Sequence, residues 1–336
     1  MYVFDWAQFR VLNFRRARNI IKLFSSYYIS RWSKRVYLSG YPVVLSIEPT
    51  SYCNLKCPQC PTGMGTLERP AGYMNFDLYR SIIDEIGDYL TNVQLFFQGE
   101  PFMHKQLPQM IQYARQKNIY TTTSTNGHFL DTQNVDAILD SGLNALVIGL
   151  DGVSPEAYRS YRQNGRLETV VQGIQRLITK RNNRKLKHPK ICLQFIVLKS
   201  NQDQIDAVKK FGRELNVDKV LIKTAQIYNN TNIDDFLPDD PALSRYKKAG
   251  GKLQLNVSVP NHCKRVWTTA VFTWDGRLAA CCFDKDAEHS FGIWNGVPFF
   301  DLWRSERGML FRRRILKNRH EIPMCRNCTE GIKIYK

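Results

Sequence analysis

The sequence predicts an α/β protein, a partial (β/α)6 barrel followed by a smaller C-terminal α+β domain. Six short apolar runs alternate with helical patterns between residues 43 and 225, and residues 226–262 are then rich in Asn, Asp, Pro and Gly. Near the C-terminus, an Asp275-Gly276 pair separates two further apolar runs. Strands that alternate with helices form βαβ units and a parallel sheet. Six units are too few to close an eight-stranded barrel, so we expect an open one.

The apolar runs give the expected strands in chain order: 43–47, 93–97, 119–124, 145–150, 191–198 and 219–223. Helical spacing of apolar residues predicts the intervening helices at 77–89, 107–117, 132–140, 155–180 and 204–215. The Asp-Gly pair is a strong hairpin signal and predicts strands at 268–273 and 277–283. The chain of 336 residues therefore divides into a basic helical segment (1–42), the barrel (43–225), a connector (226–262) and the C-terminal domain (263–336).

The N-terminal segment mixes apolar and aromatic residues with eight basic residues and one acid over residues 2–35. The apolar face of the expected helix consists of Phe14, Ile20, Ile21, Leu23, Phe24 and Tyr28. This face either packs on the body of the protein or docks on an anionic membrane surface, with residues 1–40 as the contact. No apolar run is long enough to span a bilayer, and arginines interrupt any secretory signal. We expect a cytoplasmic protein, at most peripheral to the inner membrane surface.

The net charge of +18 is concentrated in residues 1–40, 176–190 and the tail from 304 onward. Basic clusters of this kind bind nucleic acid, anionic membranes or acidic partners. The aromatic and basic interleaving of a nucleic-acid groove is not evident in the central region, and no nucleic-acid partner is expected.

Eight of the nine cysteines fall into two groups, one near the front of the chain and one at the back. In a reducing compartment such clusters indicate metal binding or catalysis rather than disulfides. Cys192 stands alone in an apolar run and is expected to be a buried small residue of a strand.

The first group, Cys53, Cys57 and Cys60, directly follows the first strand. Three thiolates within eight residues can ligate three irons of a [4Fe–4S] cubane and leave the fourth iron without a protein ligand. A bidentate amino-acid group of a cofactor can chelate that open iron. A structural zinc site is the alternative, but zinc sites are usually built from paired CxxC units with a fourth ligand close by.

From residue 42 to residue 328 the chain resembles the radical S-adenosylmethionine (radical SAM) superfamily. The CxxxCxxC motif maps onto the three cysteines, and three further motifs follow the second, third and fourth strands. These are Gln98-Gly99-Glu100-Pro101, Ser124-Thr125-Asn126-Gly127 and Gly149-Leu150-Asp151-Gly152. The resemblance implies that Gln98, Gly99, Glu100, Ser124, Asn126 and Asp151 bind S-adenosylmethionine, which the enzyme cleaves to a 5′-deoxyadenosyl radical. It also implies a flavodoxin or ferredoxin-type electron donor.

Three residues depart from the superfamily pattern. Gln59 replaces an aromatic residue that stacks near the adenine, Gly149 replaces a Ser near the ribose, and Gln98 replaces the first Gly of the commoner GGE motif. None of these changes removes a cluster ligand.

The second group comprises Cys263, Cys281, Cys282, Cys325 and Cys328. A CxxC alone could be zinc, redox or structural. With the hairpin and a preceding barrel, it resembles the auxiliary-cluster domain of the SPASM/twitch group, which implies one auxiliary [4Fe–4S] cluster held by Cys263, Cys281, Cys325 and Cys328. Neighbouring residues of a strand point to opposite faces, so only one of Cys281 and Cys282 should ligate, and the Gly276-x4-Cys281 spacing favours Cys281. Zinc remains the rival at this site.

The resemblance implies a radical SAM oxidoreductase that abstracts hydrogen from a small sugar-like or anionic metabolite, with a net oxidation like that of a dehydrogenase. A maturase that modifies a ribosomally made peptide is one alternative. A non-catalytic iron–sulfur scaffold at a membrane surface is another. His104, beyond the second strand, is a candidate proton acceptor.

Overall fold

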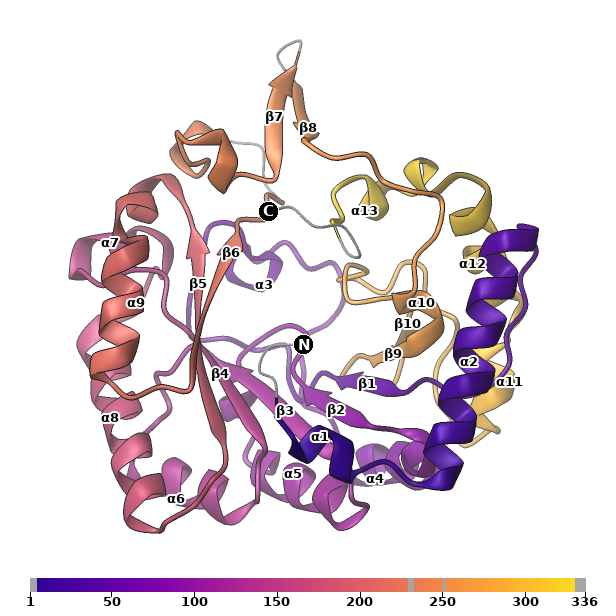
Figure 1. Cartoon of the computed structure of the whole chain (residues 1–336), viewed down its shortest axis with the longest axis horizontal. Helices are drawn as coiled ribbons and strands as arrows, with labels where there is room; N and C mark the ends of the chain where they lie inside the picture. Colours follow the sequence, from indigo (N-terminus) through magenta and orange to yellow (C-terminus); the bar gives the residue numbers. More distant parts are fainter. Residues whose placement is uncertain (1–4, 229–232, 250–251, 330–336) are drawn as a thin grey trace.

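The computed structural model describes residues 5–228, 233–249 and 252–329. Its main sheet has eight strands in the order β10-β9-β1-β2-β3-β4-β5-β6. Figure 1 shows these strands as an open, curved wall with helices on its outer side. All neighbours are parallel except β9 and β10, which are antiparallel. The partial-barrel prediction is confirmed.

The six barrel strands are β1 (Val44–Ile47), β2 (Asn92–Leu95), β3 (Tyr120–Thr125), β4 (Ala145–Gly149), β5 (Lys190–Val197) and β6 (Lys219–Thr224). Each lies within two residues of its predicted bounds. The helices between them are α3 (Pro61–Met64), α4 (Phe76–Ile86), α5 (Leu107–Gln116), α6 (Thr132–Asp140), α7 (Pro155–Tyr161), α8 (Leu167–Asn183) and α9 (Ile205–Glu214). Three short 3-10 segments complete the barrel, η1 (Gly87–Tyr89), η2 (Pro101–Met103) and η3 (Lys199–Gln204).

The helix α4 illustrates how the barrel is built. Its N-cap Asn75 accepts hydrogen bonds from the first-turn backbone, which satisfies donors that no helical carbonyl can reach. Tyr79, Ile82, Ile83 and Ile86 recur at helical spacing and are fully buried in the main hydrophobic core. This face holds α4 on the sheet and brings the loops that follow the strands to one edge.

The predicted C-terminal hairpin forms, but it belongs to the barrel sheet. Its strands are β9 (Thr269–Phe272) and β10 (Leu278–Ala279), and β9 pairs in parallel with β1 in the register Leu45↔Ala270. The expected strand 277–283 therefore ends at Ala279. The chain turns after this residue and returns through Asp284, whose carboxylate accepts from the Ala280 amide.

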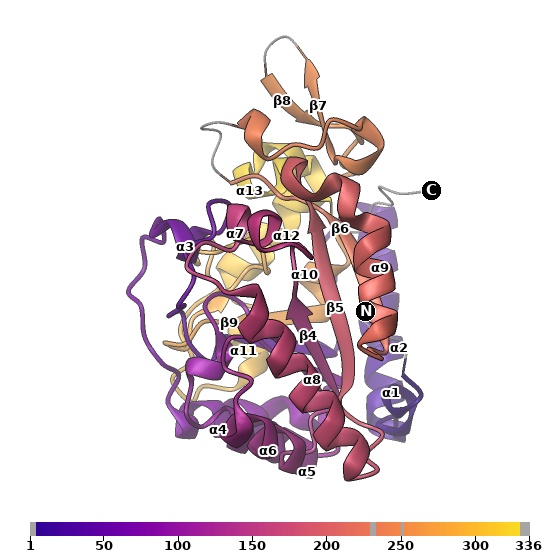
Figure 2. The same cartoon turned by 90° about the vertical axis from the view of Figure 1, so that its left-hand side faces the viewer.

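The predicted connector contains a hairpin that the sequence did not reveal. Strands β7 (Tyr246–Ala249) and β8 (Lys252–Leu255) pair with each other alone, after the short segments η4 (Ile233–Asp235) and η5 (Pro241–Leu243). Both views show this hairpin projecting beyond the rest of the molecule (Figures 1 and 2). The remaining elements are α10 (Arg265–Thr268), α11 (Phe299–Trp303), α12 (Glu306–Asn318), η6 (Arg319–Glu321) and α13 (Pro323–Arg326).

The N-terminal helices are α1 (Ala7–Arg10) and α2 (Phe14–Ser33), and α2 packs with a face other than the predicted one. The buried side is largely polar and consists of Arg16, Asn19, Leu23, Ser26, Tyr27 and Ser30. The Arg16 guanidinium donates to four backbone carbonyls, those of Val11, Gly87, Lys117 and Asn118. Of the predicted face only Leu23 is fully buried, while Phe14 and Ile21 are 83% and 66% exposed.

Within the described ranges, no helix combines the length and the apolar character needed to cross a membrane.

Candidate active site

The first cysteine loop follows β1 and lies at the edge of the sheet where the parallel strands end. Cys57 is buried, and Cys53 and Cys60 pack against the same small apolar cluster. Burial raises the pKa of Cys53 to about 12 and that of Cys57 to about 11. Thiols in this environment ionise when they bind a metal, and the iron ions of a cluster would supply the positive charge that stabilises their thiolates. The loop therefore fits a cluster site.

Glu100, directly after β2, joins the second and third strand ends. Its buried carboxylate accepts from the Thr125 hydroxyl at 2.8 Å and from the Asn126 and Phe102 amides at 2.7 and 3.1 Å. Burial raises the pKa of Glu100 to about 7, although these hydrogen bonds act to lower it. Its position agrees with the predicted cofactor edge.

Gly99 lets this second loop approach the cysteine loop. Its φ is +72°, and a Cβ there would lie 2.7 Å from the Tyr52 carbonyl oxygen and closer still to that of Thr50. The Glu100 amide donates to the same Tyr52 carbonyl at 2.8 Å. A side chain at residue 99 would push apart the two loops that carry the candidate ligands.

Gly99→Ala is expected to lower the free energy of unfolding by about 1–3 kcal/mol and to reduce iron incorporation. Gly65→Ala is a matched control, because Gly65 has a similar φ of +67° but nothing within 4 Å of its would-be Cβ. Both variants strain the backbone, but only Gly99→Ala disturbs the contact between the two loops. Thermal unfolding and iron assays on both variants therefore separate the two effects. Equal losses of iron in the two variants would contradict this account.

Asn126, at the end of β3, contacts the cysteine loop directly. Its amide nitrogen donates to the Asn54 side chain at 2.7 Å and lies 3.9 Å from the Cys53 sulfur. Ser124 lies on β3 opposite Val147 of β4 and is partly exposed. Both residues thus belong to the edge that the motifs predicted.

Asp151 is fully buried, and its carboxylate is already paired. One oxygen accepts from the Ile196 amide at 2.7 Å, and the other meets the Arg162 guanidinium at 2.6 and 2.7 Å. Arg162 also hydrogen-bonds the Cys57 thiol. This interaction lowers the pKa of Cys57, but the opposite effect of burial is larger. Gly149 stands where the superfamily usually has a serine. A Cβ at this position would come within 3.0 Å of the Arg162 Cζ, so the glycine leaves room for the guanidinium.

Arg162 was missed from the sequence, since nothing near it in the chain marks it as part of a site. It follows α7, eleven residues after Asp151. Only the folded barrel brings its side chain between Asp151 and the cysteine loop.

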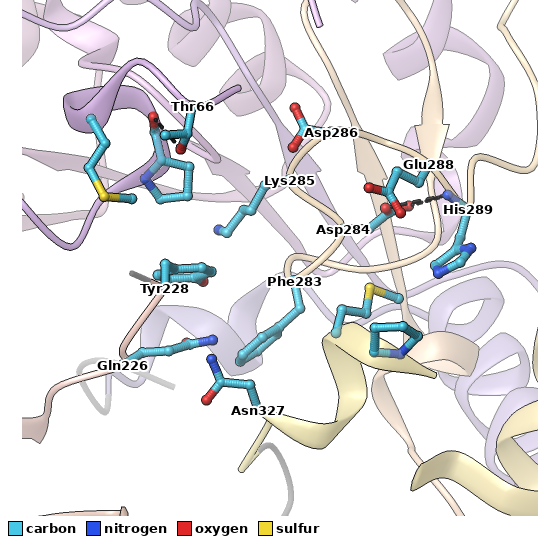
Figure 3. A pocket seen from close by; sticks show the side chains of 14 residues that line it. Thr66, Gln226, Tyr228, Phe283, Asp284, Lys285, Asp286, Glu288, His289 and Asn327 are labelled. Carbon is cyan, nitrogen blue, oxygen red and sulfur yellow. Dashed lines mark hydrogen bonds between the residues drawn. The ribbon is translucent and has the colours of Figure 1, made fainter. Parts of the chain in front are cut away.

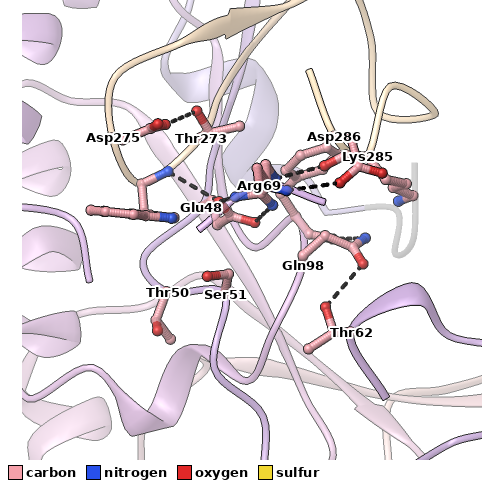
Figure 4. Close-up of polar contacts among 12 residues, drawn as sticks. Glu48, Thr50, Ser51, Thr62, Arg69, Gln98, Thr273, Asp275, Lys285 and Asp286 are labelled. Atoms are coloured by element: carbon pink, nitrogen blue, oxygen red, sulfur yellow. Dashed lines mark hydrogen bonds and ion pairs between the residues drawn. The ribbon is translucent and has the colours of Figure 1, made fainter. Parts of the chain in front are cut away.

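The other two residues that depart from the superfamily pattern, Gln98 and Gln59, also have hydrogen-bond partners. Gln98 accepts a hydrogen bond from the hydroxyl of Thr62, two residues after Cys60 (Figure 4). Gln59 is buried, and its side-chain oxygen accepts from the Tyr228 amide at 2.9 Å. An aromatic residue from beyond β6 is thereby held beside the cysteine loop.

His104 has both ring nitrogens engaged by the backbone. Nε2 lies 2.8 Å from the Met74 carbonyl oxygen, and Nδ1 accepts from the Gln106 amide at 3.1 Å. A neutral ring with its proton on Nε2 satisfies both contacts and leaves no lone pair for a substrate proton. The geometry favours a structural role for His104 over the role of proton acceptor, for which the sequence made it a candidate.

In the second group, Cys263, Cys281, Cys325 and Cys328 are all buried, and Cys282 is partly exposed. Cys281 interacts electrostatically with Cys328 and Cys263 as well as with its neighbour Cys282, whereas Cys282 interacts also with Tyr228. The two adjacent thiols thus face different surroundings, which supports Cys281 over Cys282 as the ligand.

Arg319 lies beside three of the four buried thiols, Cys263, Cys325 and Cys328, and was also missed from the sequence. Its guanidinium donates to the Cys328 sulfur at 3.3 Å and to the His262 carbonyl at 3.1 Å. The negative charges of Cys263, Cys328 and Cys325 raise its pKa. A buried arginine beside three cysteines fits a group that carries net negative charge, as a thiolate-ligated cluster does.

Among the residues that the structure describes, no three His, Cys, Asp or Glu side chains converge tightly enough to hold a single metal ion.

A buried ion pair ties the loop after α3 to the C-terminal hairpin (Figure 4). Both guanidinium nitrogens of Arg69 bind the Glu48 carboxylate, at 2.7 and 2.5 Å, and Arg69 Nε donates to the Lys285 carbonyl at 2.7 Å. Glu48 also accepts from the Trp274 amide at 3.0 Å. These bonds hold the loops after β1 and α3 against the hairpin turn and the chain after β10.

A cavity of about 600 Å³ lies between the two cysteine groups. Its walls come from four segments: α3 and the turn after it (Pro61, Met64, Thr66), the chain after β6 (Gln226, Tyr228), the chain after β10 (Phe283, Asp284, Lys285, Asp286, Glu288, His289), and α13 with the residue that follows it (Pro323, Met324, Asn327). Figure 3 shows Lys285 extending into this space beside Tyr228. The volume is typical of a small-molecule site.

Two family models match the chain. The model of the radical SAM superfamily matches residues 47–211, and that of an iron–sulfur cluster-binding domain, SPASM, matches residues 263–329. The matched segments contain the first cysteine loop and the second cysteine group, respectively.

Among curated proteins, the chain is similar to a tungsten-containing aldehyde ferredoxin oxidoreductase cofactor-modifying protein from Pyrococcus furiosus. The two are 26% identical over 313 residues, which cover 85% of this chain and 86% of the relative.

Solved structures show the same fold. BtrN in complex with AdoMet and 2-DOIA has a TM-score of 0.53 at 18% identity, with 87% of this chain and 94% of that one covered. Native anSMEcpe with bound AdoMet and Cp18Cys peptide has a TM-score of 0.61 at 17% identity, with 88% and 90% covered.

Proposed function

Because the chain belongs to the radical SAM superfamily and carries a C-terminal SPASM domain, we propose that it catalyses a net two-electron oxidation of a small metabolite, sugar-like or anionic. It is an enzyme of that superfamily, and its cofactors are S-adenosylmethionine, a [4Fe–4S] cluster and auxiliary iron–sulfur binding in the SPASM domain.

We assign the first cluster to Cys53, Cys57 and Cys60 and one auxiliary cluster to Cys263, Cys281, Cys325 and Cys328. When bound, these groups and S-adenosylmethionine supply a 5′-deoxyadenosyl radical and a place for one electron. The residues Gln98, Gly99, Glu100, Ser124, Asn126 and Asp151 form the edge that binds S-adenosylmethionine. In this proposal Asp151 acts chiefly by holding Arg162 against the cysteine loop.

The observation that carries the proposal is the cavity between the two cysteine groups. A substrate there lies between the radical source and the electron acceptor. It gives up one hydrogen atom, which forms 5′-deoxyadenosine, and then one electron and one proton. Glu288 and His289 line the same cavity and can accept the proton.

Lys285 supports an anionic substrate. Its ammonium lies over the Phe97 ring, 4.8 Å from the centroid, and burial lowers its pKa. In the described part of the chain no carboxylate lies within ion-pair distance of it. Lys285 is only partly exposed, and the charges near it are those of Cys282, Cys60, Cys281 and Glu48. An anionic ligand in the cavity would stabilise its ammonium, so we assign it to a carboxylate or phosphate of the substrate.

A modified peptide is the second candidate, favoured by a groove of about 1360 Å³ beside the cavity. The groove shares Tyr228 and Asn327 with the cavity and includes Leu253 and Leu255 of the β8 strand. An extended chain lying there could place one residue between the two cysteine groups.

For the cellular setting we propose a cytoplasmic enzyme supplied with electrons by a flavodoxin or a ferredoxin-type protein.

The test is hydrogen transfer from a deuterated metabolite extract, incubated anaerobically with S-adenosylmethionine, reductant and the enzyme. We expect mass spectrometry to detect deuterium in 5′-deoxyadenosine with the small-molecule fraction. Lys285→Gln should reduce this label at least about tenfold while unlabelled 5′-deoxyadenosine still forms. Label from the peptide fraction alone would favour the second candidate, and no label from either fraction would contradict hydrogen abstraction.

A further inference from the structure

The solvent-facing side of α2 carries a stripe of large apolar residues. Phe14, Ile21, Tyr28 and Trp32 are 83%, 66%, 54% and 87% exposed. Their spacings of seven, seven and four residues place them within about 40° of one another around the helix. The stripe runs along nearly the whole helix, a length of about 27 Å at a rise of about 1.5 Å per residue. We call these four residues the α2 stripe.

The α2 stripe is not needed to attach the helix. The opposite side is held by Arg16, by Asn19, which bonds the Tyr41 backbone, and by Tyr27, which packs against Trp267 at 5.6 Å. Exposed apolar residues scattered singly are ordinary, but four aligned aromatic and aliphatic side chains mark an interaction surface.

Positive charge borders the stripe on both sides. Arg15, Arg18 and Lys22 follow one edge of it and Arg31 the other, and all four are exposed. Of these four, only Arg15 pairs with a carboxylate within the described residues, that of Asp88. Residues 2–35 hold eight basic residues and one acid, so the surface around the stripe is electropositive.

The charge and the side-chain types together indicate what binds this surface. Trp and Tyr combine an apolar ring with a polar atom and prefer the boundary between lipid and water. Exposed Arg and Lys beside such residues are attracted to anionic headgroups. A protein partner would need a matching acidic groove about as long as the helix. An anionic bilayer offers an apolar interior for the stripe and negative charge for the basic border over any length.

We propose that α2 docks this enzyme on the surface of an anionic lipid bilayer, with the α2 stripe inserted at the level of the headgroups. The helix lies parallel to the surface and does not cross it. Binding requires both the apolar stripe and the basic border.

The test is co-flotation of the full-length, cluster-loaded protein with vesicles containing phosphatidylglycerol or phosphatidylcholine alone. We expect partition onto anionic vesicles to exceed that onto neutral ones at least about tenfold and to weaken at high salt. Phe14→Ser/Ile21→Ser/Trp32→Ser and Arg18→Glu/Lys22→Glu should each lower it at least about tenfold.

A matched control removes exposed apolar side chains elsewhere. Ile293 and Leu310 are 56% and 50% exposed, so Ile293→Ser/Leu310→Ser should bind vesicles like the unmodified protein. Iron content and circular dichroism establish that each variant is folded. Absence of binding, equal binding to both vesicles, or unchanged binding of the triple variant would overturn the proposal. So would a dimer that depends on the stripe, without vesicle binding, in analytical ultracentrifugation.

Discussion

Cys57→Ala is expected to abolish the formation of 5′-deoxyadenosine, with a loss of at least about 10³-fold. The variant removes one of the three thiolates that leave a fourth iron open to S-adenosylmethionine. It also removes the sulfur that Arg162 contacts. Anaerobic reconstitution followed by chromatographic detection of 5′-deoxyadenosine measures the loss.

Cys192→Ala is the matched control. Cys192 is fully buried in β5, pairs with Lys219 of β6 in the sheet, and belongs to neither cysteine group. Its loss costs packing but no ligand, so cleavage should stay within about threefold of the unmodified protein. Persistent cleavage by Cys57→Ala would contradict the assignment of the first cluster.

The double variant Cys325→Ala/Cys328→Ala is expected to reduce reconstituted iron from about eight to about four atoms per chain. Cleavage of S-adenosylmethionine should survive, because the first cysteine loop is intact, while oxidation of the substrate should be lost. Iron analysis and electron paramagnetic resonance of the reduced protein distinguish one cluster from two.

Cys282→Ala provides the control for this second prediction. Cys282 is adjacent to Cys281 but is partly exposed, whereas Cys263, Cys281, Cys325 and Cys328 are buried. Its removal should leave about eight irons. About four irons in the unmodified protein, or zinc in the second group, would contradict the auxiliary cluster.

The barrel could be predicted from the sequence because its signals are local. Each strand is a short apolar run, and each helix repeats apolar residues at helical spacing, as Tyr79, Ile82, Ile83 and Ile86 do in α4. The first cysteine loop and the three further motifs were found for the same reason, since each is a short contiguous segment after a strand.

Features set by distant contacts could not be predicted. The α2 helix turns its polar side inward because carbonyls at Gly87 and Lys117, far along the chain, accept from Arg16. Arg162 reaches the site through the fold of the barrel, where its guanidinium lies against Gly149 and pairs with Asp151. The β7–β8 hairpin lies in a segment whose turn-forming residues concealed two short strands.

The parallel pairing of β9 with β1 has a consequence for how the protein is made. Val44 leaves the ribosome long before its partner Thr269 is synthesised, so one edge of the barrel sheet stays open through most of translation. Open strand edges recruit other chains, and pairings between distant residues form slowly. We therefore expect slow translation to favour aggregation of nascent chains, and C-terminal truncations before β9 to accumulate as insoluble protein even where the barrel sequence is complete.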